Sequence, residues 1–376
     1  MIYLDAAATT KMSDKAAQSM VEAAQQYFGN PSSMHSLGYE AKNILETTRQ
    51  SLANYFNAEP QQTFFTSGAT ESNNWALESL AYYCAALGKR HIISSAIEHH
   101  SILNKLKELE KRGFKITYVM PNSSGICEVE SFEKEILPET GFIVLMGVNN
   151  ETGARQPWEQ VGALCKNKGI LFHTDATQLI PHEPLSIEYA DYISCSAHKF
   201  NGPRGIGILC VKKPNFLKPL ILGGKQEQQK RGGTENLPAI VAMNTALGER
   251  YAQAKSYDFE TDKYKKIKLL EVLKNISDLT FNGSTNNEIP IVNFYIKGID
   301  AEALKVLLNN SEIFVSSTSA CSSGDHTVSH VLKAMGCSDE VAANSIRISF
   351  DKNIGVADLI EAALTIEKNV KFLRGY

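Results

Sequence analysis

The fold is decided by the stretch Ser194-Cys195-Ser196-Ala197-His198-Lys199-Phe200-Asn201-Gly202-Pro203-Arg204-Gly205-Ile206-Gly207. One apolar run ends at Cys195 and another begins at Ile206, which indicates a loop between two strands. Glycine and proline constrain the backbone of this loop, so it can hold Lys199 in one place. A lysine held in a dry pocket can lose its proton and form an imine with an aldehyde. On this loop alone, a solvated lysine on a surface hairpin is the simpler interpretation.

The composition indicates an ordinary globular protein. The chain has 376 residues, of which 43% are hydrophobic and 21% charged, enough for one large domain and a smaller one. A net charge of -3 without a long basic run argues against nucleic acid and membrane partners. The apolar runs are too short to span a bilayer, and the first residues lack the pattern of a secretion signal. The seven cysteines are odd in number and lack zinc-ligand spacing, which favours a reduced, cytoplasmic protein.

Strands and helices alternate between residue 60 and about residue 195. Predicted strands cover Thr63–Thr66, His91–Ser94, Phe114–Met120, Phe142–Val148, Gly169–Phe172, Asp191–Cys195 and Ile206–Val211. Predicted helices include one that Ser13 caps and that runs to about Phe28, and Trp158–Lys168. Continuous apolar strands such as Phe142–Val148 are typical of buried parallel sheets. The pattern therefore predicts an α/β domain with a largely parallel sheet.

Five polar residues follow strands of this predicted sheet: Thr70, His99, Asn150, Asp175 and Lys199. Doubly wound sheets bind ligands at the carboxyl ends of their strands. Taken singly, Thr70 could belong to a plain capped turn and His99 could simply cap a helix. The repeated coincidence nevertheless favours a functional site over a solvated lysine.

The pattern changes after about residue 255. Shorter strands are predicted at Ile291–Tyr295, Ile313–Ser316 and Ile346–Ser349, and helices at Ala301–Leu308, His326–Met335 and Val356–Leu373. We interpret this part as a smaller α/β domain that the strand Ile2–Leu4 can join.

An imine-forming lysine suits pyridoxal phosphate, whose ring nitrogen needs a facing carboxylate. Asp175 meets this need, His99 could cover the ring face, and Gln178 could donate to the phenolic oxygen. Hydroxyl and backbone donors for the phosphate are available from Ala69, Thr70, Ser196 and His198.

Two further residues point to an amino-acid substrate and to thiol chemistry. Arg347, on a predicted strand, could bind a carboxylate in bidentate fashion, although a structural ion pair is the alternative. Cys321 lies in a run of small polar residues, where an exposed thiol is a candidate nucleophile and an incidental loop cysteine is the alternative.

The residues match a known family. The chain resembles the pyridoxal-phosphate-dependent cysteine desulfurases of the class V aminotransferase family, which have the aspartate-aminotransferase-like fold, fold type I. The resemblance rests on Tyr3-Leu4-Asp5 with Ala8-Thr9-Thr10, Gly29-Asn30-Pro31-Ser32-Ser33 with His35, Thr66-Ser67-Gly68-Ala69-Thr70-Glu71-Ser72-Asn73-Asn74, Glu98-His99, Val148-Asn149-Asn150-Glu151-Thr152-Gly153, Asp175-Ala176-Thr177-Gln178, Ser196 with His198-Lys199, Gly202-Pro203, Arg231, Gly233-Thr234-Glu235-Asn236, Ser319-Ala320-Cys321 and Ser345-Ile346-Arg347.

The resemblance implies a fold and a division into domains. A large α/β domain, residues 13–255, would bind the cofactor on a mainly parallel seven-stranded sheet. A smaller α/β domain, residues 1–12 and 256–376, would carry the catalytic cysteine loop. The polar stretch from Ser322 to Ser329 is similar to the longer loop of the subgroup that hands sulfur to an acceptor protein.

The resemblance also implies roles for single residues. Lys199 would carry the cofactor and move protons, His99 would stack on its ring and act in acid–base steps, and Cys321 would take sulfur from L-cysteine to leave L-alanine and an enzyme persulfide. Asp175 would hold the ring nitrogen and Gln178 the phenolic oxygen. Thr70, Ser196 and His198 would hold the phosphate. Asn150 and Arg347 would bind the substrate carboxylate.

The implied partners are a second copy of the chain and a sulfur acceptor. Thr234 would reach the phosphate of the neighbouring subunit's cofactor in a homodimer. Sulfur would pass to an acceptor protein serving iron–sulfur cluster assembly or thiolation, and no resident metal is implied, Cys321 being at most a transient iron–sulfur ligand. The chain ends at Tyr376 without the longer tail with which housekeeping members contact scaffolds, which leaves the acceptor open.

Some positions depart from the family pattern, and other functions stay open. The residues that depart from the pattern are Ala6, Ala197, Lys225, Gln228 and Thr318. None of these departures removes a chemical group from the site. The alternatives are a selenocysteine lyase, another transaminase or lyase for small substrates, and an inactive paralogue that binds partners.

Overall fold

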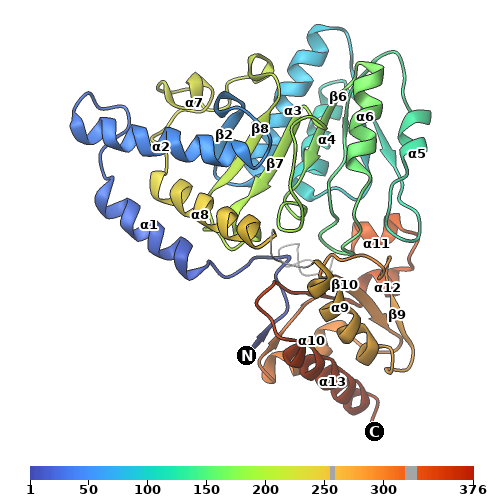
Figure 1. Ribbon diagram of the computed structural model, residues 1–376. Helices are drawn as coiled ribbons and strands as arrows, with labels where there is room; N and C mark the ends of the chain where they lie inside the picture. Colours follow the sequence, from blue (N-terminus) through green and yellow to red (C-terminus); the bar gives the residue numbers. More distant parts are fainter. Residues whose placement is uncertain (255–258, 318–327) are drawn as a thin grey trace.

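A seven-stranded sheet forms the centre of the larger part of the protein (Figure 1). The computed structural model describes residues 1–254, 259–317 and 328–376. The strand order is β2-β8-β7-β6-β5-β3-β4. The strands are β2 (Thr63–Thr66), β3 (His91–Ser95), β4 (Lys115–Val119), β5 (Thr140–Val144), β6 (Leu171–Asp175), β7 (Tyr192–Ser196) and β8 (Gly207–Val211). The pairings of β8 with β2 and with β7 are antiparallel and the other four are parallel, so the predicted, largely parallel α/β sheet is confirmed.

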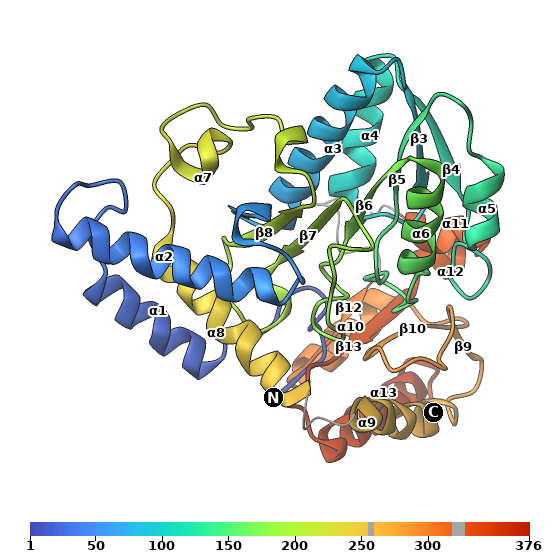
Figure 2. The same cartoon turned by 45° about the horizontal axis from the view of Figure 1, so that its top comes forward.

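Helices cover both faces of this sheet. Successive residues of a strand point to opposite faces, and in these strands both sets are apolar and need to be covered. Phe64, Ile92 and Phe142 pack with α3 (Ala69–Ala86) and α4 (His100–Lys111). The residues that follow them in the chain, Phe65, Ile93 and Ile143, belong to the core of the other face. That core also includes residues of α6 (Trp158–Lys168) and α8 (Leu237–Ala254). The remaining helices of this part are α1 (Asp14–Gln26), α2 (Ser36–Asn54), α5 (Val129–Lys134) and the short α7 (Gln226–Gln229). Figure 2 shows the resulting layers.

A second, smaller core lies below the large sheet in Figure 1. Its antiparallel sheet has the order β12-β13-β10-β9, with strands β9 (Leu279–Phe281), β10 (Ile291–Ile296), β12 (Ser316–Ser317) and β13 (Ser345–Ser349). The helices are α9 (Phe259–Leu273), α10 (Ala301–Asn310), α11 (His330–Ala334), α12 (Asp339–Ala343) and α13 (Val356–Leu373). The limits of the two domains stay a prediction, and the limit at residues 255/256 lies outside the described residues.

The first residues of the chain join the two parts. Strand β1 (Ile2–Tyr3) pairs in parallel with β11 (Ile313–Phe314), and the amide of Ala6 donates to the carbonyl of Ser349 in the small part. A few residues further on, the amide of Thr10 donates to the carbonyl of His198, beside Lys199. The segment therefore runs from the small sheet to the lysine loop.

Several boundaries differ from those predicted. The strand predicted at Phe142–Val148 ends at Val144, although the amides of Leu145 and Gly147 still donate to the carbonyls of His173 and Asp175 on β6. The strand predicted at Ile313–Ser316 is split into β11 and β12, which belong to different sheets. The helix predicted at His326–Met335 is described only from His330 to Ala334. Ser13 caps α1 as predicted, since its side chain accepts from the amide of Ala16. Within the described ranges, no helix is both long and apolar enough to span a membrane.

Candidate functional site

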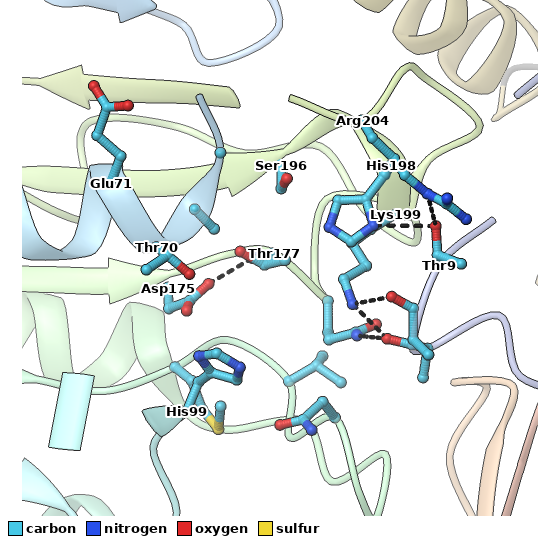
Figure 3. Close-up of a pocket in the computed structure, with 18 of the residues that line it drawn as sticks. Thr9, Thr70, Glu71, His99, Asp175, Thr177, Ser196, His198, Lys199 and Arg204 are labelled. Atoms are coloured by element: carbon cyan, nitrogen blue, oxygen red, sulfur yellow. Dashed lines mark hydrogen bonds between the residues drawn. The ribbon is translucent and has the colours of Figure 1, made fainter. Parts of the chain in front are cut away.

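A cavity of about 600 Å³ opens at the carboxyl ends of the strands of the large sheet (Figure 3). Among its lining residues are Ala69, Thr70, His99, Asn150, Asp175, Gln178, Ser196, His198, Lys199 and Arg347. The structure therefore brings together almost all of the residues singled out in the sequence. Thr234 does not line the cavity and is exposed on the loop before α8. Cys321 lies outside the described residues.

Lys199 reaches into the cavity from the loop that follows β7. A single 3₁₀ turn, Ala197–Lys199, ends this strand, and the amide of Gly202 then donates to the carbonyl of Ala197. The Lys199 Nζ donates to the carbonyls of Ala7 at 2.6 Å and Ala8 at 2.8 Å. Gln178 donates to the same Ala7 carbonyl at 2.7 Å, so the first segment of the chain holds both side chains. The lysine is thus a partly buried amine at a fixed position, not a solvated surface group.

Asp175 is the last residue of β6, and its carboxylate is almost fully buried, with 4% of the residue exposed. One carboxylate oxygen accepts from the Asn73 amide at 2.7 Å, and the other accepts from the backbone amide of Thr177 at 2.9 Å. These donors fix the position of the carboxylate at the cavity wall. A fixed buried carboxylate is what a protonated ring nitrogen requires.

His99 caps the N-terminus of α4 and lies below Asp175 in Figure 3. Its Nδ1 accepts from the backbone amide of Ser101 at 3.1 Å, and the Ser101 hydroxyl lies 2.8 Å from the same nitrogen. Burial lowers the pKa of the His99 imidazole, and the charges of Lys199 and His100 act in the same direction against that of Asp175. The ring is therefore neutral around pH 7 and available for proton transfer.

An anion cradle lies at the N-terminus of α3. Gly68 precedes this helix with φ +153°, and no side chain caps the first amides of the helix. Ser196, His198 and Thr70 surround the same end of the cavity, and a Cβ on Gly68 would approach the Ser196 hydroxyl to 3.3 Å. Amides at a helix N-terminus, hydroxyls and a histidine are suitable phosphate donors. Together with the lysine and the buried carboxylate, this donor set fits pyridoxal phosphate.

His198 stays uncharged in this cradle. Burial lowers the pKa of His198 to about 4, and the positive charges of Lys199 and Arg204 contribute. Its Nδ1 lies 3.2 Å from the Thr9 hydroxyl, which also accepts from Arg204 at 3.4 Å. A neutral histidine can donate one hydrogen bond to an anion without adding a charge.

Arg347 enters the cavity from β13 of the small part. It donates to the Asp5 carboxylate at 2.8 Å and to the carbonyl of Asn150 at 2.9 Å. Its Nε is buried and has no partner among the described residues. The ion pair that we considered for Arg347 is therefore present, yet the guanidinium keeps N–H capacity for a further acceptor.

The sequence did not single out Thr9, Thr177 or Arg204 as members of the site, although all three line the cavity. Arg204 lies in the loop of Lys199, so its place in that loop is a signal that could have found it. Thr9 could not have been found in this way, because its contacts lie about 190 residues away in the chain.

The fold and this donor set define a pyridoxal phosphate enzyme of fold type I, and comparison with known proteins places the chain more closely. It belongs to the aminotransferase class-V family, whose model matches residues 2–359. The chain is 36% identical to "Cysteine desulfurase IscS" of Dictyoglomus turgidum over 99% of its length and 95% of the relative's. The expected family and its cofactor are thereby confirmed.

Solved structures agree with this placement. A NifS-like protein superposes with a TM-score of 0.91 at 34% identity, over 99% of both chains. The structure of SspA in complex with cysteine superposes with a TM-score of 0.79 at 33% identity, over 93% of this chain and 99% of the other. The expected fold type I architecture is confirmed.

Proposed function

We propose that the protein is a cysteine desulfurase that converts L-cysteine to L-alanine and keeps the sulfur as a persulfide on Cys321. One observation carries the proposal: a single cavity brings Lys199, Asp175 and His99 of the large part together with Arg347 of the small part. The relatives named cysteine desulfurase and the cysteine complex of SspA support the choice of substrate.

In this proposal the described residues divide the work between binding and proton transfer. Pyridoxal phosphate, when bound, withdraws electrons from the amino acid attached to it. Asp175 would hold its ring nitrogen, Gln178 would donate to its phenolic oxygen, and His99 would cover its ring face. Ala69, Thr70, Ser196 and His198 would hold the phosphate. Arg347 and Asn150 bind the substrate carboxylate, which places the substrate Cα within reach of Lys199, the base that takes its proton.

Sulfur transfer needs a thiolate. The Cys321 thiolate attacks the substrate sulfur, the Cβ–S bond breaks, and its electron pair takes up a proton to give the methyl group of alanine. The step balances without an external oxidant or reductant. Burial raises the pKa of the thiols of Cys84, Cys127, Cys165, Cys195, Cys210 and Cys337. Since thiolates are the nucleophiles, these six are poor candidates, which supports Cys321.

The wider context belongs to the same proposal. A cytoplasmic homodimer, in which Thr234 reaches the neighbouring subunit's phosphate, gives the exposed loop before α8 a role. The persulfide would pass to an acceptor protein, in iron–sulfur cluster assembly or thiolation, and relatives that bear the name IscS support the first route.

The test measures alanine formed from L-cysteine by the purified protein with a thiol reductant, and persulfide trapped by alkylation in a single turnover without the reductant, alongside Cys321→Ser and, as a matched control, Cys337→Ser. We expect alanine and an alkylatable persulfide from the wild type and the control, and neither from Cys321→Ser. Persulfide formation by Cys321→Ser would refute the role of this cysteine. A yellow protein that makes no alanine even with the wild-type sequence would refute the substrate while leaving the cofactor in place.

A further inference from the structure

A chain of buried polar groups connects Asp175 to His99 behind the wall of the cavity. The Asn73 amide nitrogen lies 2.7 Å from an Asp175 carboxylate oxygen and 2.9 Å from the Ser101 hydroxyl. The Ser101 hydroxyl lies 2.8 Å from His99 Nδ1. Asn73 is fully buried and Ser101 is 9% exposed, and neither lines the cavity. Hydrogen bonds in such a place have little competition from water.

The Asp175 carboxylate sets the direction of these bonds. An ionised carboxylate only accepts, so the NH₂ group of Asn73 must face it. The same NH₂ group carries the second donor, which reaches the Ser101 hydroxyl oxygen. The amide oxygen of Asn73 then faces His173 Nε2 at 3.1 Å, while His173 Nδ1 faces the Tyr192 carbonyl at 3.2 Å. The orientation of the amide is thus set by the Asp175 carboxylate, which only the NH₂ group can face.

The orientation of the Asn73 amide also determines where the hydroxyl proton of Ser101 points. Because its hydroxyl oxygen accepts from Asn73, its single hydroxyl proton is free to point at His99 Nδ1. The backbone N–H of Ser101 donates to the same nitrogen at 3.1 Å. A nitrogen that receives two donors carries no proton itself, so the proton of the neutral ring sits on Nε2.

We propose that Asn73 and Ser101 are positioning residues that hold His99 as the neutral imidazole protonated at Nε2, with the charge of Asp175 setting the direction of the bonds. The inference rests on the proposed function in one respect: the proposed function assigns His99 as an acid–base group. The carboxylate that faces the cofactor ring nitrogen thereby also fixes which proton His99 can give into the cavity.

The surroundings of the ring agree with a neutral His99. Its charged and titratable neighbours are Asp175 on β6, Lys199 on the lysine loop, His100 on α4 and His330 on α11. Burial lowers the pKa of His99, Lys199 and His100 lower it further, and Asp175 alone opposes them. Protonation at Nδ1 would set the new N–H against two donors, so it would have to break both bonds.

The test is nitrogen NMR of the holoenzyme labelled with ¹⁵N-histidine, in which His99→Gln assigns the signal. We expect a protonated Nε2 and an acceptor-type Nδ1 at pH 7.5. A signal from the Nδ1–H tautomer or from imidazolium would overturn the proposal directly, with no variant needed. The tautomer is observed independently of turnover, so a correct tautomer without alanine formation would refute only the proposed function.

A pair of variants tests the hydroxyl. Ser101→Ala removes one donor to Nδ1 and should raise the His99 pKa by up to about one pH unit, because a hydrogen bond to the neutral form is lost. The acidic limb of the pH profile of kcat/KM should move in the same direction. Ser101→Thr keeps the hydroxyl and should keep the wild-type pKa. Equal His99 pKa values in the wild type and Ser101→Ala would show that the hydroxyl has no such role.

Discussion

The guanidinium of Arg347 donates to the carboxylate of Asp5 at 2.8 Å, although the two residues are more than 300 positions apart in the chain. The arginine is 3% exposed, and its second N–H group is held by the carbonyl of Asn150. The side chain is therefore oriented before any substrate arrives. A charge that is already oriented loses little conformational entropy when it binds a carboxylate.

Arg347→Lys should raise the KM for L-cysteine by roughly tenfold or more, because a lysine cannot replace the planar, bidentate donor set. Steady-state kinetics measure this, and the visible absorbance of the bound cofactor should not change. Arg374→Lys, at the end of α13, is the matched control and should behave as the wild type. An unchanged KM in Arg347→Lys would remove the arginine from the substrate site.

Gly207→Ala should reduce both stability and cofactor affinity. The added Cβ would lie 2.6 Å from the carbonyl oxygen of Cys195 and 2.7 Å from the Cα of Gly68, so β8 must shift against the anion cradle. Gly205→Ala is the control, since nothing lies within 4 Å of its Cβ and its φ of +79° costs only about 1–2 kcal/mol. Thermal unfolding with and without pyridoxal phosphate separates the loss of stability from the loss of cofactor affinity. Equal cofactor affinity in both variants would contradict the close approach.

Glu98→Gln should stabilise the protein above about pH 5. Glu98 is fully buried, one of its oxygens has no partner among the described residues, and burial raises the pKa of this carboxyl to about 8. The folded state thus keeps a proton that the unfolded state loses above pH 4.5, so wild-type stability falls as the pH rises from 4.5 to 8.

The gain from Glu98→Gln should be roughly 1–4 kcal/mol at pH 7.5 and should vanish near pH 4, where both states are protonated. Urea unfolding at the two pH values measures it. A gain that does not depend on pH would mean that Glu98 is ionised in the folded protein.

Arg49→Met should cost about 3–5 kcal/mol, because it leaves the buried carboxylate of Glu227 without its partner. Arg49 binds both oxygens of Glu227, at 2.9 and 2.6 Å, and its guanidinium lies 4.4 Å from the centre of the Phe65 ring. Denaturant unfolding tests the prediction. A loss below about 1 kcal/mol would show that the pair is not a structural anchor.

Gln228→Gly should instead stabilise the same loop by up to about 1 kcal/mol. Glu227, Gln228 and Gln229 have φ values of 44°, 55° and 64°, a region that costs side-chain-bearing residues energy. Gln228 is one of the positions at which the sequence departs from the pattern of the family it resembles. Unfolding measured beside the wild type decides the sign, and a destabilised variant would indicate that the Gln228 contact to the Gln61 carbonyl outweighs the backbone cost.

Much of the cavity could be predicted because its residues follow strands. Buried strands are visible as apolar runs, and the carboxyl ends of parallel strands meet at one edge of a sheet. This rule alone placed Thr70, His99, Asp175 and Lys199 together. The direction of β8 could not be predicted in this way, since an apolar run looks the same in a parallel and an antiparallel strand.

What stayed hidden depends on contacts between distant parts of the chain. The carbonyls of Ala7 and Ala8 hold Lys199, but a backbone carbonyl leaves no mark in a sequence. Asn73 and Ser101 look like ordinary helix residues until the fold places them between Asp175 and His99. Strand β9 and helix α9 were not predicted, the strand because its three residues are too few to show a period.

The segment between β1 and Thr10 has a consequence for biosynthesis. Ile2 and Tyr3 pair with Ile313 and Phe314, and Ala6 binds Ser349, while the carbonyls of Ala7 and Ala8 hold the lysine amine. Residues 2–6 therefore cannot take their places until residues 313–349, which are synthesised later, are available. The surroundings of Lys199 are complete only late in synthesis, and the growing chain cannot load its cofactor in the native setting before the small part has emerged.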